Sequence, residues 1–335
     1  MSEVAETTQD PAVLVAEVEA LGVRLSHVRE AIGRVIFGQD LVVERVLITL
    51  LSGGHVLLVG VPGLGKTKLV DTLGTVLGLD PRRVQFTPDL MPADILGSEV
   101  LEEDAHGHRA FRFIKGPIFC QLLMADEINR ASPRTQSALL QAMQEHRVAI
   151  GGEIHALPTP FHVLATQNPI EQEGTYPLPE AQLDRFLLEI EVTYPDEAAE
   201  RAMLLATTGA REAKPIQAMT GAELVTAQAL IRRIPVGEQV LEAILKLVRG
   251  ARPETTGLDT VRKHLAWGPG PRAAQALMLA TRARALLDGR LAPSVDDVIA
   301  LAEPVLRHRM ALTFAARADG VRIGEVIEAL KDSLG

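Results

Sequence analysis

The chain is poor in aromatic residues, in cysteine and in positive charge. Of its 335 residues, 3% are aromatic and one is a tryptophan, so stacking platforms for single-stranded nucleic acid are scarce. The net charge of −9 disfavours nucleic acid as a partner, because wholesale binding normally requires a basic surface. The single cysteine, Cys120, excludes an internal disulfide framework, and we interpret it as a buried core thiol.

Long hydrophobic runs are also lacking. No run approaches the roughly 20 apolar residues that a helix needs to cross a bilayer, so we expect no membrane insertion. Residues 1–10 are acidic and lack the basic-then-apolar order of a secretory signal. We expect them to form a flexible tail and the protein to be cytoplasmic. The chain is long enough for about two domains.

Residues 60–67 read Gly-Val-Pro-Gly-Leu-Gly-Lys-Thr and fit the phosphate-loop pattern G-x-x-x-x-G-K-[ST]. An apolar run precedes them and a helical pattern follows, as this loop requires. Lys66 would reach the β- and γ-phosphates, and Thr67 would offer its hydroxyl to Mg²⁺. The sequence therefore predicts binding of a nucleoside triphosphate together with Mg²⁺, and the resemblance described below implies that this nucleotide is ATP. The residues assigned to the nucleotide here are Gly60, Pro62, Gly63, Leu64, Gly65, Lys66, Thr67 and Lys68.

Short apolar runs alternate with helical patterns in the first part of the chain, which predicts an α/β fold. We expect a five-stranded parallel sheet with helices on both faces. The expected strands are 56–59, 83–86, 121–125, 161–166 and 186–192. Two hairpins interrupt this order, one between Ala93 and Gly116 and one around Gly151-Gly152. After Pro195 no strand is expected, so we predict a core over 11–195 and an all-helical lid domain over 196–335.

The third expected strand ends in two carboxylates, Asp126 and Glu127. At the carboxyl end of a parallel strand they would face the same crevice as the phosphate loop. Asp126 would hold Mg²⁺ through its water shell, and Glu127 would orient and deprotonate the attacking water. The alternative is two solvated acids that cap a strand, and the neighbouring phosphate loop favours the catalytic interpretation.

Four further polar residues carry two interpretations each. Asn168 could hydrogen-bond the attacking water, although the local sequence fits an ordinary Asn-Pro turn better. Arg185 could stabilise the charge of phosphoryl transfer or form a surface salt bridge, and Arg130 has the same ambiguity. Arg272 could reach back to the nucleotide from the start of a helix, or be an ordinary first-turn arginine.

Two groups of histidines and arginines are interpreted as solvated. His106 and His108 could begin a metal site, but no third ligand lies nearby, so an exposed hairpin tip is the better interpretation. The segment Arg307-His308-Arg309 is interpreted as the solvated face of a helix.

Taken together, the motifs resemble those of MoxR-type AAA+ ATPases, over about residues 35 to 312. The phosphate loop, the two carboxylates and the residues around Asn168 and Arg185 carry this resemblance along with four further stretches. These stretches are Gln85–Gly97, Ala125–Ala131, Gln136–Glu145 and His308–Met310.

The resemblance implies roles for residues whose local sequence is ambiguous. Asn168 would be the sensor of the γ-phosphate, and Arg185 a finger that acts on a neighbouring subunit. Arg272 would be a second sensor, although Pro269 just before it departs from the family pattern. The segment Phe37, Gly38 and Gln39 would form the loop beside the adenine.

The resemblance also implies an assembly and a task. We expect a homo-oligomer, usually a hexameric ring, that matures client enzymes or inserts their metals or cofactors. A protein with a von Willebrand factor A domain is the expected partner. The alternatives are a magnesium-chelatase-like motor subunit, a nucleotide-gated scaffold with negligible turnover, and a nucleic-acid motor, which the charge disfavours. The client, the number of subunits and the choice between Arg130 and Arg185 as the finger stay open.

Overall fold

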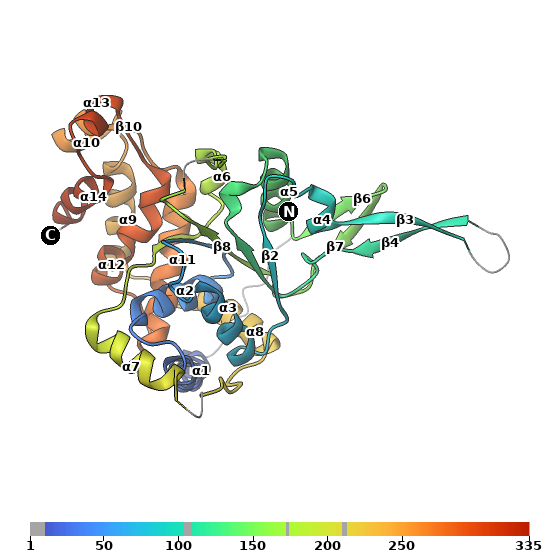
Figure 1. The fold of residues 1–335 in the computed structure, drawn as a ribbon. Coiled ribbons are helices and arrows are strands. Elements are labelled where there is room, and N and C mark those ends of the chain that lie inside the picture. The colour runs from blue at the N-terminus through green and yellow to red at the C-terminus, as the bar shows by residue number, and fades with distance from the viewer. Residues whose placement is uncertain (1–10, 104–108, 172–173, 210–212, 335) are drawn as a thin grey trace, which may run out of the picture.

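A five-stranded parallel sheet lies at the centre of the computed structural model, which describes residues 11–103, 109–171, 174–209 and 213–334 (Figure 1). All its strand pairs are parallel, so the predicted sheet is confirmed. In spatial order its strands are β2 (Pro81–Gln85), β5 (Leu122–Asp126), β8 (His162–Gln167), β1 (Val56–Val59) and β9 (Leu188–Glu191). The predicted tail 1–10 and the hairpin tip with His106 and His108 lie outside the described residues.

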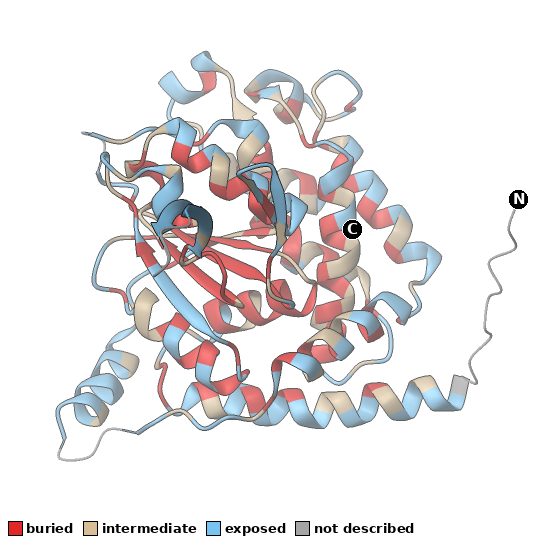
Figure 2. Ribbon diagram, turned by 90° about the vertical axis from the view of Figure 1, so that its right-hand side faces the viewer, coloured by how far each residue is buried: buried red, intermediate tan, exposed pale blue. Residues whose placement is uncertain are grey.

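Successive side chains of the central strands enter two different hydrophobic clusters. In β1, Val56 and Leu58 face one cluster and Leu57 the other, as expected for strands buried on both faces. The first face is covered by α1 (Pro11–Gly33), α2 (Asp40–Leu51), α3 (Lys66–Val76) and α8 (Gly221–Arg233). The second is covered by α4 (Pro92–Leu96) and α5 (Pro133–Glu145). Figure 2 shows the buried strands enclosed by helices with exposed outer faces.

Cys120 belongs to the second cluster and is buried. Burial raises the pKa of its thiol to about 12, so the thiolate form is disfavoured at neutral pH. The interpretation as a core thiol is confirmed.

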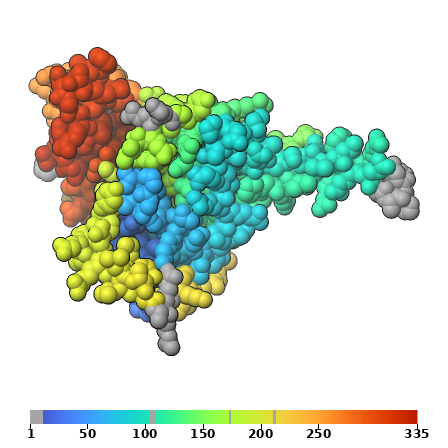
Figure 3. All heavy atoms as spheres, viewed as in Figure 1, coloured from blue at the N-terminus to red at the C-terminus, as the bar shows by residue number. Residues whose placement is uncertain are grey.

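Both predicted hairpins form. One consists of β3 (Gly97–Glu103) and β4 (Arg109–Lys115) and projects from the body as a slim arm (Figures 1 and 3). The other consists of β6 (Arg147–Ile150) and β7 (Glu153–Ala156). Its turn residues, Gly151 and Gly152, have φ of 60° and 87°, the left-handed region that tight hairpin turns demand. The rings of Phe113 and His155 stack with centroids 4.2 Å apart, which joins the two hairpins.

The rest of the chain is almost entirely helical. Within the first hydrophobic cluster, α11 packs against α1, α2 and α8, and α12 packs against β9, whereas α9 and α14 pack mainly on other helices of the C-terminal part. The helices are α7 (Glu197–Thr207), α9 (Glu238–Gly250), α10 (Asp259–His264), α11 (Pro271–Leu287), α12 (Val295–Leu306), α13 (Phe314–Ala318) and α14 (Ile323–Asp332). Short single turns occur at η1 (Ile128–Arg130), α6 (Glu180–Leu183) and η2 (Arg307–Arg309).

This helical part also holds a two-stranded antiparallel sheet that the sequence analysis did not predict. It consists of β10 (Leu265–Trp267) and β11 (Ala311–Leu312). Strands of three and two residues are too short to show an alternating pattern. Across the described ranges, no helix combines the length and apolarity needed to span a membrane.

The interpretation of Arg307-His308-Arg309 as a solvated face is wrong. His308 and Arg309 are buried. The guanidinium of Arg309 donates to Oδ1 of Asp184 at 2.7 Å and to the carbonyl oxygen of Phe186 at 2.6 Å. Burial lowers the pKa of His308 well below its usual range, so its ring is neutral. These bonds fasten η2 to the segment that leads into β9.

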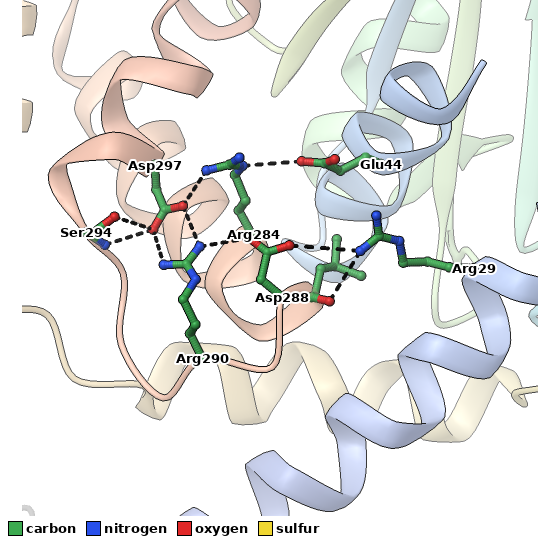
Figure 4. Close-up of polar contacts among 8 residues, drawn as sticks. Arg29, Glu44, Arg284, Asp288, Arg290, Ser294 and Asp297 are labelled. Atoms are coloured by element: carbon green, nitrogen blue, oxygen red, sulfur yellow. Dashed lines mark hydrogen bonds and ion pairs between the residues drawn. The ribbon is translucent and has the colours of Figure 1, made fainter. Parts of the chain in front are cut away.

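A buried carboxylate joins α12 to α11 (Figure 4). Asp297 is fully buried and accepts hydrogen bonds from Arg284 at 2.6 Å, from Arg290 at 2.7 Å and from the backbone N–H of Ser294 at 2.8 Å. Arg284 also donates to Glu44 of α2 at 3.2 Å. Burial by itself raises the pKa of Asp297, but the bonds from Arg290 and Ser294 outweigh it and leave the pKa below its usual range.

Replacing Asp297 with Asn is expected to destabilise the protein, because it leaves two arginines without their buried counter-charge. The expected loss is about 3 kcal/mol of unfolding free energy, measured by urea denaturation at pH 7. Asp296→Asn is the matched control, since Asp296 is exposed in the same first helical turn, and it should cost about 0.5 kcal/mol.

The same comparison has a pH signature. A carboxylate whose folded-state pKa is lowered stabilises the fold above its unfolded pKa of about 4, and the contribution disappears as the pH falls through the folded value. The difference in unfolding free energy between wild type and Asp297→Asn should therefore shrink below about pH 4. An unchanged gap at pH 7 and pH 3 would contradict this account of the network.

Candidate nucleotide-binding site

The carboxyl ends of β1, β5 and β8 meet at one edge of the sheet. Val59 is paired with Gln167, and Ala125 with Ala165, so the segments that follow these strands lie side by side. Between them is a cavity of about 270 Å³. Its lining residues are Pro62, Gly63, Leu64, Gly65, Lys66, Thr67, Arg83, Gln85, Asp126, Glu127 and Asn168. The structure thus brings the predicted phosphate loop, both carboxylates and Asn168 together.

The glycines of the loop are required by its backbone. The N–H of Gly60 donates to the carbonyl of Gln167 at 3.1 Å, and a Cβ on Gly60 would lie 2.5 Å from the carbonyl oxygen of Val192. Gly63 and Gly65 have φ of 85° and 71°, which side chains disfavour. The chain therefore curls tightly before α3, and the helix start offers N–H groups and a positive dipole end to an anion.

Lys66, the first residue of α3, donates from Nζ to the carbonyl oxygen of Gly60 at 2.5 Å. Burial lowers the pKa of its ammonium, and the nearby carboxylates of Asp126 and Glu127 oppose that shift. The ammonium is thus held over the loop that would cradle the phosphates.

Both oxygens of Asp126 are engaged by protein donors. Oδ1 accepts from Thr166 Oγ1 at 2.5 Å, and Oδ2 accepts from Nη2 of Arg83 at 2.5 Å. Thr166 in turn accepts from the backbone N–H of Glu127 at 2.9 Å. This hydroxyl on β8 therefore fixes the end of β5 from the neighbouring strand.

Glu127 has a left-handed backbone, with φ of 54° and ψ of 51°. For a residue with a side chain this conformation costs about 1–3 kcal/mol, and such strain collects at functional sites. Its Oε2 accepts from Gln85 Nε2 at 2.7 Å and from Arg130 Nη1 at 3.0 Å. The strained turn directs the carboxylate into the cavity, and two donors from different elements hold it there.

Asn168 lines the cavity and also forms the predicted turn, while its contact with water or phosphate stays a prediction. Its side chain is buried and lines the cavity, while Oδ1 accepts from the backbone N–H of Ile170 at 3.1 Å, as in an ordinary turn. Because Oδ1 is bound in this turn, the amide nitrogen is the group left to face a ligand.

A second cavity of about 300 Å³ adjoins the loop and shares Pro62 to Gly65 with the first. Phe37, Gln39 and Lys68 line it, and Nε2 of Gln39 donates to the carbonyl of Leu64 at 2.8 Å. Gly38 has a φ of 66°, and a Cβ there would lie 2.2 Å from Cβ of Ala199. The segment 37–39 is thus pressed against α7, on the side of the loop expected for the base.

Sequence analysis missed the contribution of α7 to this second cavity. Glu200, Met203 and Thr207 line it, but no residue of α7 is buried. A helix without a buried stripe gives no sequence signal for which of its faces is functional.

Arg185 and Arg272 lie away from both cavities. They line a third cavity together with Gln144 and Arg309, and Nη1 of Arg272 is 3.6 Å from Oδ2 of Asp184. The expectation that Arg272 reaches back to the nucleotide stays a prediction, since its side chain lines this third cavity. The buried Nε of Arg185 has no hydrogen-bond partner.

Arg83 and Gln85 were not singled out from the sequence, although they line the main cavity. Both lie on β2, two residues apart, so their side chains leave the strand on the same face. The signal was the presence of two polar side chains at alternate positions of an expected strand.

The donor set fits Mg²⁺. The hydroxyl of Thr67 and the carboxylate of Asp126 line the same cavity, and oxygen ligands shared with substrate phosphates are what Mg²⁺ prefers. Elsewhere in the part of the chain that the structure describes, no cluster of three or more His, Cys, Asp or Glu could hold a metal ion.

Comparison with known proteins places this geometry in a family. Residues 55–188 match the model of the ATPase family associated with various cellular activities (AAA), and residues 259–330 match the AAA lid domain. The chain is 43% identical to Chaperone MoxR1 of Mycobacterium tuberculosis, over 92% of this chain and 80% of that protein. It is 32% identical to Protein MoxR of Paracoccus denitrificans, over 87% and 89% of the two chains.

A solved structure gives the same result. A candidate ATPase from Cytophaga hutchinsonii superposes with a TM-score of 0.87 at 37% identity, covering 94% of this chain and 96% of that one. The chain is therefore an ATP-hydrolysing member of the AAA family and belongs to its MoxR-like group.

Proposed function

We propose that the main cavity binds Mg²⁺-ATP and that hydrolysis there drives the remodelling of client proteins. The observation that supports this most directly is the convergence of Lys66, Asp126 and Glu127 on one cavity beside a phosphate loop. A cation for the polyphosphate and carboxylates for metal and water are the minimum set for this reaction.

Five side chains of the cavity and the backbone of the loop then have a task. The N–H groups at the start of α3 bind the phosphates, and Lys66 turns from the Gly60 carbonyl to the β- and γ-phosphates. Thr67 and Asp126 would hold Mg²⁺, which neutralises charge on the phosphates when bound. Glu127 takes the proton of the attacking water, and the amide nitrogen of Asn168 donates a hydrogen bond to the γ-phosphate or that water.

The base occupies the second cavity. The loop of Phe37, Gly38 and Gln39 contacts the adenine from one side, and α7 from the other. Lys68 lies in the first turn of α3, where its side chain borders this cavity.

Arg185 and Arg272 act on the nucleotide of an adjacent subunit in this proposal. Their cavity is distinct from the phosphate loop of their own chain, and proteins of the AAA family typically form oligomers. We assign Arg185 as the finger, because Arg130 is already bonded to Glu127 within its own chain. The assembly is a hexameric ring, with residues 11–195 as the nucleotide-binding core and 196–335 as the lid.

The work of the ring is chaperone-like, as the name of the relative Chaperone MoxR1 suggests. Its clients are enzymes that need maturation or a metal or cofactor, and it acts with a protein that carries a von Willebrand factor A domain. The β3–β4 arm offers a contact surface, because Leu101 and Phe111 are paired across it and are 50% and 70% exposed.

Glu127→Gln is expected to lower the rate of ATP hydrolysis by about 10²–10⁴, because the amide cannot accept the proton of water. Binding of ATP should be retained, as measured by calorimetry beside a steady-state phosphate assay. Glu238→Gln is the control, since Glu238 is exposed at the start of α9. Turnover at the wild-type rate in Glu127→Gln would refute the catalytic assignment.

Mixing two inactive variants tests the shared site. Arg185→Ala and Glu127→Gln chains should each be slow alone but regain activity when mixed, because mixed rings contain junctions with an intact Glu127 facing an intact Arg185. Arg185→Ala alone should lose about 10³-fold, while Arg249→Ala, at an exposed position on α9, should not.

The mixing experiment also separates the two arginines. If Arg130→Ala is rescued by Glu127→Gln and Arg185→Ala is not, Arg130 is the residue that acts across the junction. Absence of rescue for both would contradict a site shared between subunits.

Partner binding should depend on the nucleotide and on the arm. Glu127→Gln loaded with ATP is expected to retain a purified A-domain partner in size-exclusion chromatography, and the ADP-loaded protein to release it. Phe111→Ser should weaken the complex at least tenfold while leaving ATP binding intact, since the arm lies outside the cavity. Equal retention in ATP and ADP would argue against a nucleotide-driven cycle.

A further inference from the structure

The edge strand β2 places an arginine on the carboxylate proposed to hold the metal. In the sheet β2 pairs with β5 alone, with Arg83 opposite Met124 and Gln85 opposite Asp126. Side chains two apart on a strand share a face, so Arg83 and Gln85 both lie beside the end of β5. Arg83 therefore lines the same cavity as Lys66.

Arg83 and Gln85 connect the two carboxylates of the cavity. Nη2 of Arg83 donates to Oδ2 of Asp126 at 2.5 Å and to Oε1 of Gln85 at 3.0 Å. Nε2 of Gln85 donates to Oε2 of Glu127 at 2.7 Å. One amide thus orients the guanidinium with its oxygen and the carboxylate of Glu127 with its nitrogen.

We infer that Arg83 and Mg²⁺ compete for Asp126, so that Arg83 weakens metal binding at this site. The inference rests on the proposed function, because it takes Asp126 as the carboxylate that holds the metal. Oδ1 of Asp126 is bound to Thr166 and Oδ2 to Arg83. A metal with its water shell reaches this carboxylate only when the guanidinium moves away from Oδ2, and the two cations also repel each other.

Arg83 is able to make this move. Its side chain is 50% exposed, whereas that of Asp126 is 13% exposed. The guanidinium can therefore swing toward solvent or toward bound phosphates without being buried elsewhere. A polyphosphate adds negative charge to the cavity, which both attracts Arg83 away from Asp126 and favours the metal. The metal would consequently enter with the nucleotide rather than before it.

Arg82 shows what an ordinary surface pair on this strand looks like. It lies on the opposite face of β2, and its Nε is 3.6 Å from Oδ2 of Asp80. Arg82 does not line the cavity, although its side chain is 49% exposed, close to the value for Arg83. Arg82 is therefore a matched control for charge, strand and exposure.

The test measures metal affinity rather than hydrolysis. The full chain is saturated with a fluorescent N-methylanthraniloyl-ADP, and free Mg²⁺ is titrated to find the concentration that gives half of the fluorescence change. ADP is used because it has no γ-phosphate for Arg83 to contact. Arg83→Gln is expected to lower this concentration by roughly three- to tenfold, the scale of one partly exposed charged hydrogen bond.

Two further variants separate charge from structure. Arg83→Lys keeps the charge and should stay within about twofold of wild type, whereas Arg83→Met should behave as Arg83→Gln does. Arg82→Gln should leave the half-saturating Mg²⁺ concentration unchanged. Urea midpoints of all variants show whether each is folded, and the exposed edge position predicts midpoints close to that of wild type.

Asp126→Asn distinguishes a failure of the proposed competition from a failure of the metal assignment itself. If Asp126→Asn raises the half-saturating Mg²⁺ concentration but Arg83→Gln leaves it unchanged or raises it, the competition is refuted and the metal assignment stands. If Asp126→Asn leaves the concentration unchanged, Asp126 does not hold the metal, and both the assignment and the competition fall. A rise with Asp126→Asn and a fall with Arg83→Gln supports both.

Discussion

The parallel register of β1, β5 and β8 is the constraint on which the candidate site depends. Because Val59 is paired with Gln167 and Ala125 with Ala165, the three strands end within one residue of the same level. The phosphate loop, the two carboxylates and Asn168 then follow around one cavity. A slip of one residue would reverse the faces of a strand, so the hydrophobic clusters that fix the register also fix the distances in the cavity. Fold and site are in this sense set by the same pairing.

Within the cavity, the charged side chains are already hydrogen-bonded to groups of the protein. Lys66 is held by a backbone carbonyl, Asp126 by Arg83 and Thr166, and Glu127 by Gln85 and Arg130. Such bonds preorganise the groups, which lowers the entropic cost of binding. They must also be exchanged when a nucleotide and a metal arrive, so that only the surplus of the new interactions appears as affinity. The groups of the site are thus ordered before binding, and their hydrogen bonds can be exchanged for bonds to the ligand, as a cycle of binding and release requires.

The arginines of the third cavity, Arg185, Arg272 and Arg309, are held differently. Arg309 is buried and bound to Asp184 and to backbone carbonyls ahead of β9, so it fixes the helical part of the chain to the core. Arg185 and Arg272 lie beside this anchor, in a cavity that shares no lining residue with the one at the phosphate loop. Arg272 is exposed, with Nη1 3.6 Å from Oδ2 of Asp184, and the buried Nε of Arg185 has no hydrogen-bond partner, so both cations remain available for the proposed action on a neighbouring subunit. The anchor would keep their position constant while the cavity exchanges its ligands.

The sequence predicted correctly those elements whose conformation is determined by residues close together in the chain. Residues 56–59 and 122–125 are continuous apolar runs because both faces of their strands are buried, and the loop glycines are dictated by backbone conformation at Gly63 and Gly65. Arg309 and Arg83 were missed or misread because their partners, the carbonyl of Phe186 and the carboxylate of Asp126, are distant in sequence.

Identical residue types fill opposite roles in the chain. Arg82 faces outward and Arg83 lines the cavity, and nothing in the two adjacent letters separates them. What separates them is the pleat of β2 and its pairing with β5, which direct alternate side chains to opposite faces. The role of a charged residue on a strand therefore becomes readable only once the register with its neighbour is known.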